Sequence, residues 1–257
     1  AEDVEAFNAR AYARVGGVLR LTEGVPAQVT LPHVREAGLI VADRPDRLQA
    51  LSLPALERAV RVQVDGELER LSLPRLRHLE ALDLAEAPAL KALVAPALPS
   101  LDTLSATVVP GARWRLPALA WLGTLTWTGG PAGAAPHWLG LDAWEAGDAV
   151  WIDTDAQALL HGPSLDRLGA LSVRAPDGSR AKLVALREIT GDVRWAVPDY
   201  PPEALTGVDG DLVIEAGATE WPALQVVAGD LWVQGPAVTG VFLPALVAVG
   251  GRVAVRG

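Results

Sequence analysis

The chain has 257 residues, and its 22 Lys and Arg against 31 Asp and Glu leave a net charge of −9. This acidic balance disfavours nucleic acid and anionic membrane surfaces as partners. The absence of cysteine excludes disulfides and thiolate metal ligands, and no apolar run reaches the roughly 18 residues of a membrane-spanning helix. We therefore expect a folded chain with a sizeable core, no membrane insertion and no nucleic-acid partner.

The first predicted element is a short helix within residues 1–15. Val4, Phe7, Ala11 and Val15 recur at helical spacing, so their side chains would share one face. The apolar face of so short a helix has to be covered by the rest of the chain. We expect this helix to cap the start of the structure that the following residues build.

Residues 16–128 repeat one pattern. The tetrapeptide Leu-Pro-x-Leu occurs at residues 53–56, 73–76, 98–101 and 116–119, and again at 243–246, each time before a short alternating strand. The centres of successive strands are about 21 residues apart, and strands repeated at a constant period stack into a parallel sheet. Proline suits a corner of such a coil, because it fixes φ and has no N–H to leave unpaired.

The repeat resembles two known kinds of unit. Residues 73–84, which read Leu-Pro-x-Leu-x-x-Leu-x-x-Leu-x-Leu, resemble a leucine-rich repeat, and residues 221–233 resemble a unit of the receptor L domains. With twelve candidate strands, the resemblance implies a right-handed parallel β-solenoid of about 12 coils, poor in helix and forming one domain over residues 1–257. The cysteines of receptor L domains are missing, so no receptor role follows. Asn8 is the only asparagine, so the asparagine ladder of ordinary leucine-rich repeats must be replaced by something else.

The pattern is interrupted at residues 129–147, which are rich in glycine and proline and are expected to form an irregular inserted loop. Loops on a rigid scaffold often carry binding, and exposed tryptophan is a common anchor for a partner. Trp138 and Trp144 are therefore candidate contacts. The alternative is that they fill a widened coil, and Trp127 and Trp151 on the flanking strands are expected to point inward.

Regular coils resume over residues 148–257. Arg194, Val213, Trp232 and Ala254 are predicted to point outward from four consecutive strands. The row is apolar from Val213 onward, and an exposed apolar patch marks a contact surface. We expect these four residues to belong to a binding surface, whereas outward positions of the first half, among them Ile40, are expected to be solvated.

Asp192, Asp211 and Asp230 each follow a glycine, precede a strand and are spaced by 19 residues. One hypothesis is a row of carboxylates that binds Ca²⁺. The other, which we favour, is a turn in which the glycine adopts a positive φ and the aspartate accepts backbone N–H groups in place of the missing asparagines. The favoured hypothesis assigns no metal to the protein.

Nothing in the sequence indicates catalysis. The four histidines lack metal-ligand spacing and no Gly-x-Ser-x-Gly motif occurs, so we expect neither an enzyme nor a cofactor. We expect a non-catalytic binding protein that contacts a protein or glycan. The lack of cysteine and of any methionine before Ala1 favours an exported bacterial protein, extracytoplasmic as a secreted, periplasmic or cell-surface component. The alternative is a structural spacer or assembly subunit that docks or self-associates through the uncapped strand edge at residues 253–255.

Overall fold

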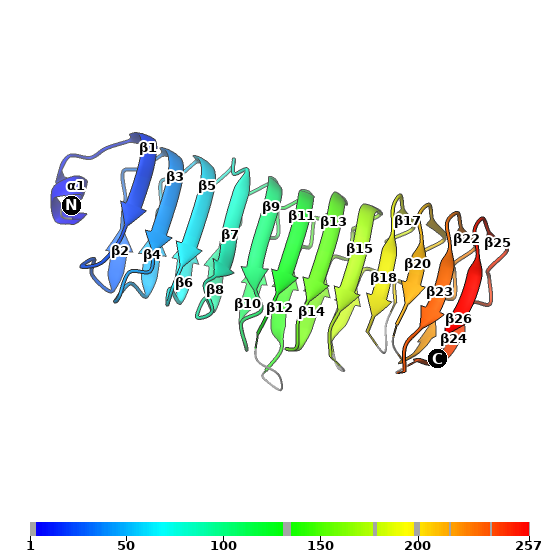
Figure 1. Ribbon diagram of the computed structural model, residues 1–257. Helices are drawn as coiled ribbons and strands as arrows, with labels where there is room; N and C mark the ends of the chain where they lie inside the picture. Colours follow the sequence, from blue (N-terminus) through cyan, green and yellow to red (C-terminus); the bar gives the residue numbers. More distant parts are fainter. Residues whose placement is uncertain are drawn as a thin grey trace.

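The computed structural model describes residues 4–130, 135–176, 179–197, 201–215, 217–236 and 238–256. In this part of the chain the strands wind into a parallel β-solenoid of about 11 turns (Figure 1). Helix α1 (Val4–Ala9) lies at the N-terminal end and is the only helix among the described residues. The predicted solenoid, its period of about 21 residues and its short N-terminal helix are confirmed.

Two sheets run along the solenoid, and each of the first eight coils contributes one strand to each sheet. Sheet A begins with β1 (Arg14–Leu21), β3 (Glu36–Asp43), β5 (Arg58–Asp65), β7 (Ala81–Glu86), β9 (Ser100–Thr107), β11 (Trp121–Thr128), β13 (Ala146–Asp153) and β15 (Arg167–Arg174). Sheet B consists of β2 (Gln28–Thr30), β4 (Ala50–Ser52), β6 (Arg70–Ser72), β8 (Ala92–Val94), β10 (Arg113–Arg115), β12 (His137–Gly140), β14 (Ala158–His161) and β16 (Arg180–Lys182). The short strands of sheet B come just before each corner.

The last four coils differ, because each sheet A strand is divided in two. The pairs are β17 (Glu188–Ile189) with β18 (Val193–Ala196), β19 (Gly207–Val208) with β20 (Leu212–Ile214), β22 (Val226–Val227) with β23 (Leu231–Gln234), and β25 (Ala248–Val249) with β26 (Val253–Arg256). In the place of sheet B, β21 (Gly217–Glu220) pairs with β24 (Val238–Phe242). The interruptions coincide with the Gly-Asp pairs and, in the last coil, with Gly250-Gly251.

Alternate residues of each sheet A strand point into the solenoid. Leu104 of β9 pairs with Leu125 of β11, and both side chains are fully buried. The next residues along the two strands, Ser105 and Thr126, pair on the outer face. Repeated from coil to coil, this alternation builds one continuous apolar core, and each leucine buried in it contributes about 1.5–3 kcal/mol to stability.

Leucine and proline form the corner that precedes a sheet A strand. The carbonyl of Leu53 accepts a hydrogen bond from the N–H of Leu56 at 3.2 Å, which places Pro54 at the second position of a β-turn. Equivalent bonds close the turns at residues 73–76, 116–119 and 243–246. Because β4 and β6 pair in register, the prolines of the turns that follow them line up along a common edge.

In one coil the corner lies three residues before the predicted place. Leu98 donates its N–H to the carbonyl of Ala95, so Pro96 rather than Pro99 occupies the turn. Two inward-outward assignments were also wrong. Ile40 is buried inside the solenoid, and Trp151 points outward, because Val150 and Ile152 are the inward residues of β13.

The expected irregular insertion over residues 129–147 is largely absent from the described part. Strand β12 lies in register between β10 and β14. The carbonyl of Leu141 accepts the N–H of Trp144 at 3.2 Å, which is the bond that closes the Leu-Pro-x-Leu corners. Residues 131–134 of the expected loop lie outside the described residues.

Candidate functional site

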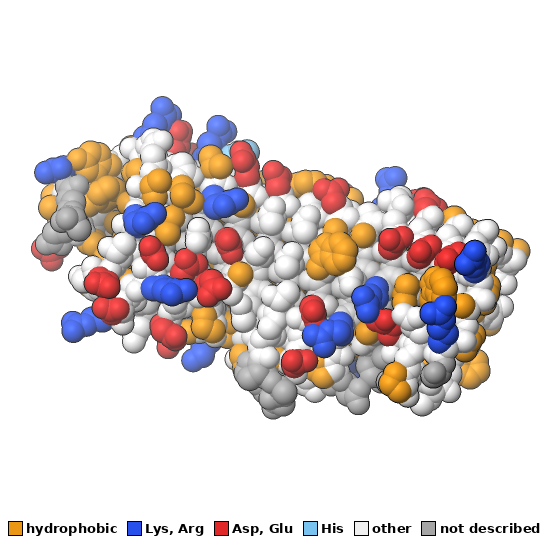
Figure 2. Space-filling model, in the orientation of Figure 1, with side chains coloured by type: hydrophobic (Ala, Val, Ile, Leu, Met, Phe, Trp, Pro, Cys, Tyr) orange, Lys and Arg blue, Asp and Glu red, His pale blue; other side chains and the backbone are white. Residues whose placement is uncertain are grey.

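The outer face of sheet A changes in character along the solenoid. Near α1 it carries ion pairs such as Arg14–Glu36, at 2.7 Å. Over β9 and β11 the outward residues form a hydroxyl grid, two strands wide and paired in register, made of Thr103, Ser105, Thr107, Thr124, Thr126 and Thr128. Figure 2 shows this face with few charges over β9 and β11 and a hydrophobic cluster over β13.

Trp151 on β13 borders the hydroxyl grid. It pairs with Thr126 on one side and with Ser172 on the other, and its side chain is 47% exposed. Two residues further along β13, Asp153 forms an ion pair with Arg174 of the next strand. A large aromatic ring, hydroxyl groups and a charged pair therefore lie together on one nearly flat surface, which sequence reasoning missed because it placed Trp151 inside.

The predicted outward row of Arg194, Val213, Trp232 and Ala254 is confirmed, since these residues pair in register from β18 to β26. Arg194 binds Glu215 through two hydrogen bonds of 2.6 and 3.0 Å. Burial raises the pKa of the Glu215 carboxyl, but hydrogen bonds from Arg194 and Gln234 and the charge of Arg194 bring it below its usual range.

Trp232 is half-buried, and the guanidinium of Arg256 lies over its ring at 4.9 Å from the centroid. A cation over an indole face is attracted to it, by about 0.5–1 kcal/mol where the pair is exposed. This contact occupies one side of the ring. The C-terminal row is therefore a weaker candidate surface than the one around Trp151.

The three predicted aspartates form a ladder. Asp192 Oδ1 accepts the N–H of Asp211 at 2.9 Å, Asp211 Oδ1 that of Asp230 at 2.7 Å, and Asp230 Oδ1 that of Arg252 at 2.7 Å. Each carboxylate thus satisfies a backbone donor of the next coil, as the turn hypothesis requires. Within the described residues no group of three or more His, Asp or Glu is arranged to hold a metal ion, so nothing adds support to the calcium hypothesis.

The glycines of these turns have a different role from the one predicted. Gly191, Gly210 and Gly229 are not in the positive φ region. A Cβ on Gly210 would instead lie 2.3 Å from Asp192 Oδ1 and 2.7 Å from the carbonyl oxygen of Gly191. Glycine is therefore needed because successive coils approach each other too closely here for any side chain.

The two tryptophans of the predicted loop are in different places. Trp144 is fully buried, and its Nε1 donates to the carbonyl of Ala146 at 2.8 Å, so its assignment to a binding surface was wrong. It fills the corner position that leucine occupies in other coils. Trp138 is half-buried on the outer face of sheet B and remains a candidate.

A histidine is buried inside the same coils. His137 Nδ1 accepts the N–H of Val109 at 3.0 Å, and the ring packs edgewise against Trp114 and Trp127, with centroids 4.4 and 4.7 Å away. Burial lowers the pKa of His137 to about 3. A histidine that is neutral and enclosed by tryptophans belongs to the core and is not placed for catalysis.

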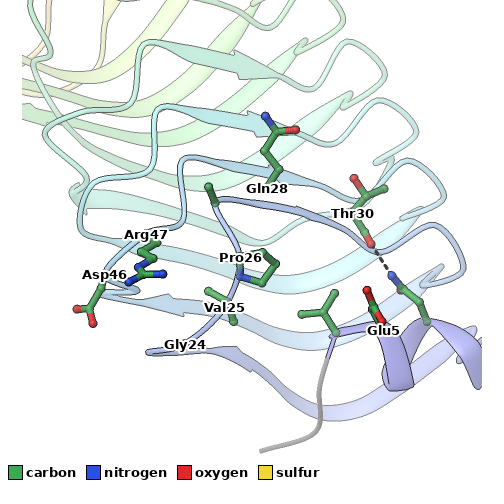
Figure 3. Close-up of a pocket in the computed structure, with 11 residues that line it drawn as sticks. Glu5, Gly24, Val25, Pro26, Gln28, Thr30, Asp46 and Arg47 are labelled. Carbon is green, nitrogen blue, oxygen red and sulfur yellow. Dashed lines mark hydrogen bonds between the residues drawn. The ribbon is translucent and has the colours of Figure 1, made fainter.

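A hollow of about 1060 Å³ lies between α1 and the first coils. In Figure 3 Val25 and Pro26 lie in its centre, with Asp46 and Arg47 on one side and Glu5 of α1 on the other. Asn8 donates from Nδ2 to the carbonyl of Thr30 at 2.9 Å and ties the helix to β2. The lining contains no convergent set of reactive groups, so we assign this hollow to loose packing of the N-terminal cap.

The opposite end of the solenoid leaves core positions uncovered. Val253 and Val255 continue the inward rows of sheet A, yet Val255 is 76% exposed, and Val247 in the last corner is 83% exposed. Such exposure is unusual for inward-facing valine. This end, with Phe242, forms an apolar surface.

Among the described residues, no helix is both long and apolar enough to cross a membrane. Comparisons with protein-family models, with curated proteins and with solved structures found no match. The chain is thus defined as a parallel β-solenoid repeat protein by its architecture alone.

Proposed function

We propose that the protein is a non-catalytic recognition protein that binds a protein or glycan partner through the outer face of sheet A. The observation that carries the proposal is Trp151, half exposed beside the hydroxyl grid on a flat sheet. The protein would be a relative of leucine-rich repeat and receptor L-domain solenoids, exported by a bacterium to the periplasm, the cell surface or the medium.

The physical support lies in the composition of this face. An exposed tryptophan offers a large apolar area at a low cost in conformational entropy, which is why it is common at binding sites. The hydroxyls of Thr124 and Thr126 can donate and accept hydrogen bonds. They lie on a rigid strand, so a partner does not have to order them on binding.

The test compares capture of glycans and of extracellular proteins by wild type and by Trp151→Ala. Val184→Ala is the matched control, because Val184 is similarly exposed, at 42%, but lies in a corner and not on the face. We expect Trp151→Ala to weaken binding at least about tenfold, as loss of a central aromatic anchor does, and Val184→Ala to leave it unchanged. Equal capture by wild type, Trp151→Ala and Trp232→Ala would overturn the proposal.

A second candidate function rests on the uncovered C-terminal end. Val247, Val253 and Val255 expose apolar side chains beside β26, one edge of which pairs with no strand among the described residues. Such a surface favours docking or assembly. In that case Val255→Lys would abolish a concentration-dependent oligomer in sedimentation experiments. A wild-type protein that stays monomeric at high concentration would count against assembly.

A further inference from the structure

The outer face of sheet B carries a second aromatic surface, at its last three strands. Trp138 of β12 pairs with Arg113 of β10, and Gly140 pairs with Arg115 on one side and with His161 of β14 on the other. His161 in turn pairs with Lys182 of β16. Arg115, Gly140, His161 and Lys182 therefore form one line along the solenoid, spanning about 14 Å at the usual strand spacing.

The indole of Trp138 lies flat on this line. A Cβ on Gly140 would be only 2.2 Å from Cη2 of Trp138, so the ring rests directly against the glycine backbone. The ring also stacks on His161, with centroids 6.4 Å apart and planes inclined by 27°. Because residue 140 is glycine, the Trp138 ring has room to lie against the backbone. We call the surface formed by the rings of Trp138 and His161 the indole shelf.

Cations flank the indole shelf at both ends. Arg115 is paired with Asp142 at 2.6 Å, whereas Arg113 and Lys182 have no ion-pair partner among the described residues. In a chain with a net charge of −9, two uncompensated cations beside a flat aromatic surface are a local departure from the general charge. They favour a ligand that is anionic and has a face able to stack.

We propose that the indole shelf binds an acidic oligosaccharide, with one pyranose ring on Trp138 and carboxylates near Arg113 and Lys182. The carbohydrate C–H groups would meet the electron-rich indole face, and the carboxylates would accept charge-assisted hydrogen bonds. This inference deepens the proposed recognition function and rests on it, but it uses the opposite sheet. A single-stranded nucleic acid also stacks and is anionic, but its binding sites combine a basic groove with several aromatic side chains for successive bases, whereas this surface has one indole and, among the described residues, two unpaired cations.

The test is calorimetric titration with an oligogalacturonate, a neutral malto-oligosaccharide of equal length and a single-stranded oligonucleotide. We expect binding of the oligogalacturonate alone, weakened at least about tenfold by Trp138→Ala, the equivalent of one lost aromatic contact. Lys182→Gln should weaken binding and reduce its dependence on salt. Tyr12→Ala, which removes an exposed aromatic ring near the N-terminal helix, is the matched control and should leave the affinity for the oligogalacturonate unchanged.

Gly140→Ala provides the sharpest variant, because it displaces the Trp138 ring without removing it. The clashing atom is at the far end of a side chain, so the coil can keep its fold while the ring moves. Unchanged circular dichroism together with lost binding would support the shelf. Failure of the oligogalacturonate to bind, equal binding of the neutral sugar, preference for the oligonucleotide, or full affinity of Gly140→Ala would each overturn it. Partner capture that still depends on Trp151 would then leave the proposed function intact.

Discussion

Acid should destabilise this protein through one buried side chain, His137. In the folded state burial lowers the pKa of His137 to about 3, from an ordinary value of 6.5. Between these two values the unfolded chain binds a proton that the folded chain excludes. The stabilisation is therefore complete above pH 6.5 and is lost as the pH falls towards 3. Protonation of Nδ1 would also remove the acceptor for the N–H of Val109.

The magnitude follows from the shift. Each pH unit between the two pKa values is worth about 1.4 kcal/mol, so the free energy of unfolding should fall by about 2 kcal/mol from pH 7 to pH 5. The full loss, reached below pH 3, is about 5 kcal/mol. A loss of this size is a substantial fraction of the stability of an ordinary domain.

The assay is urea unfolding of wild type and of His137→Asn at pH 7 and pH 5, followed by circular dichroism. Asparagine keeps an oxygen where Nδ1 accepts the N–H of Val109, but it does not titrate. The carboxylates contribute equally to the pH dependence of both proteins. Subtracting the loss of unfolding free energy in the variant from that in wild type therefore removes their contribution. We expect wild type to lose about 2 kcal/mol more than the variant. Equal losses would refute the assignment of the acid sensitivity to His137.

Three further predictions concern stability in denaturant unfolding. Asp211→Ala should cost about 1–3 kcal/mol because the N–H of Asp230 loses its acceptor, whereas Asp211→Asn should retain most of the stability; identical values for the two would contradict the ladder. Gly210→Ala should cost about 1–3 kcal/mol through the clash of its Cβ with the preceding coil, and a neutral result would contradict the close approach. Leu104→Ala should cost about 2–5 kcal/mol, while Ser105→Ala, on the outer face of the same strand, should stay within about 0.5 kcal/mol.

The solenoid was predictable because its pattern is redundant. Leucine and proline recur at the same place in many coils, so one misplaced corner, at Pro96, does not change the architecture. The turn aspartates were predictable for the same reason, since Asp192, Asp211 and Asp230 recur at one spacing. Their hydrogen bonds then follow from the stacking of the coils.

The direction of individual side chains could not be predicted where it depends on the sequence of a single coil. In β13 both alternations are apolar, since Ala149 and Trp151 compete with Val150 and Ile152, so periodicity does not select the outward residue. The same ambiguity affected Ile40, which has apolar neighbours on both sides. Only pairing with adjacent strands decides the direction, and that information is not local.

The second sheet was missed because its strands are very short and most bury only one side chain, such as Leu51 in β4. Its outer face therefore also escaped prediction. Trp138 was singled out for its type, but its partners Gly140, His161 and Lys182 are brought beside it by coils that are about 20 residues apart. A surface assembled from separate coils in this way cannot be recognised from any short sequence motif.

The aspartate ladder makes the later coils interchangeable modules. Each carboxylate accepts a backbone N–H from the next coil. The N–H of Asp211, which Asp192 accepts, and the N–H of Asp230, which Asp211 accepts, are chemically alike. Excision of residues 211–229 would join Gly210 to Asp230 and offer the N–H of Asp230 to Asp192. The solenoid could in this way become one coil shorter without an orphaned acceptor, so its length is adjustable by whole units in evolution or by engineering.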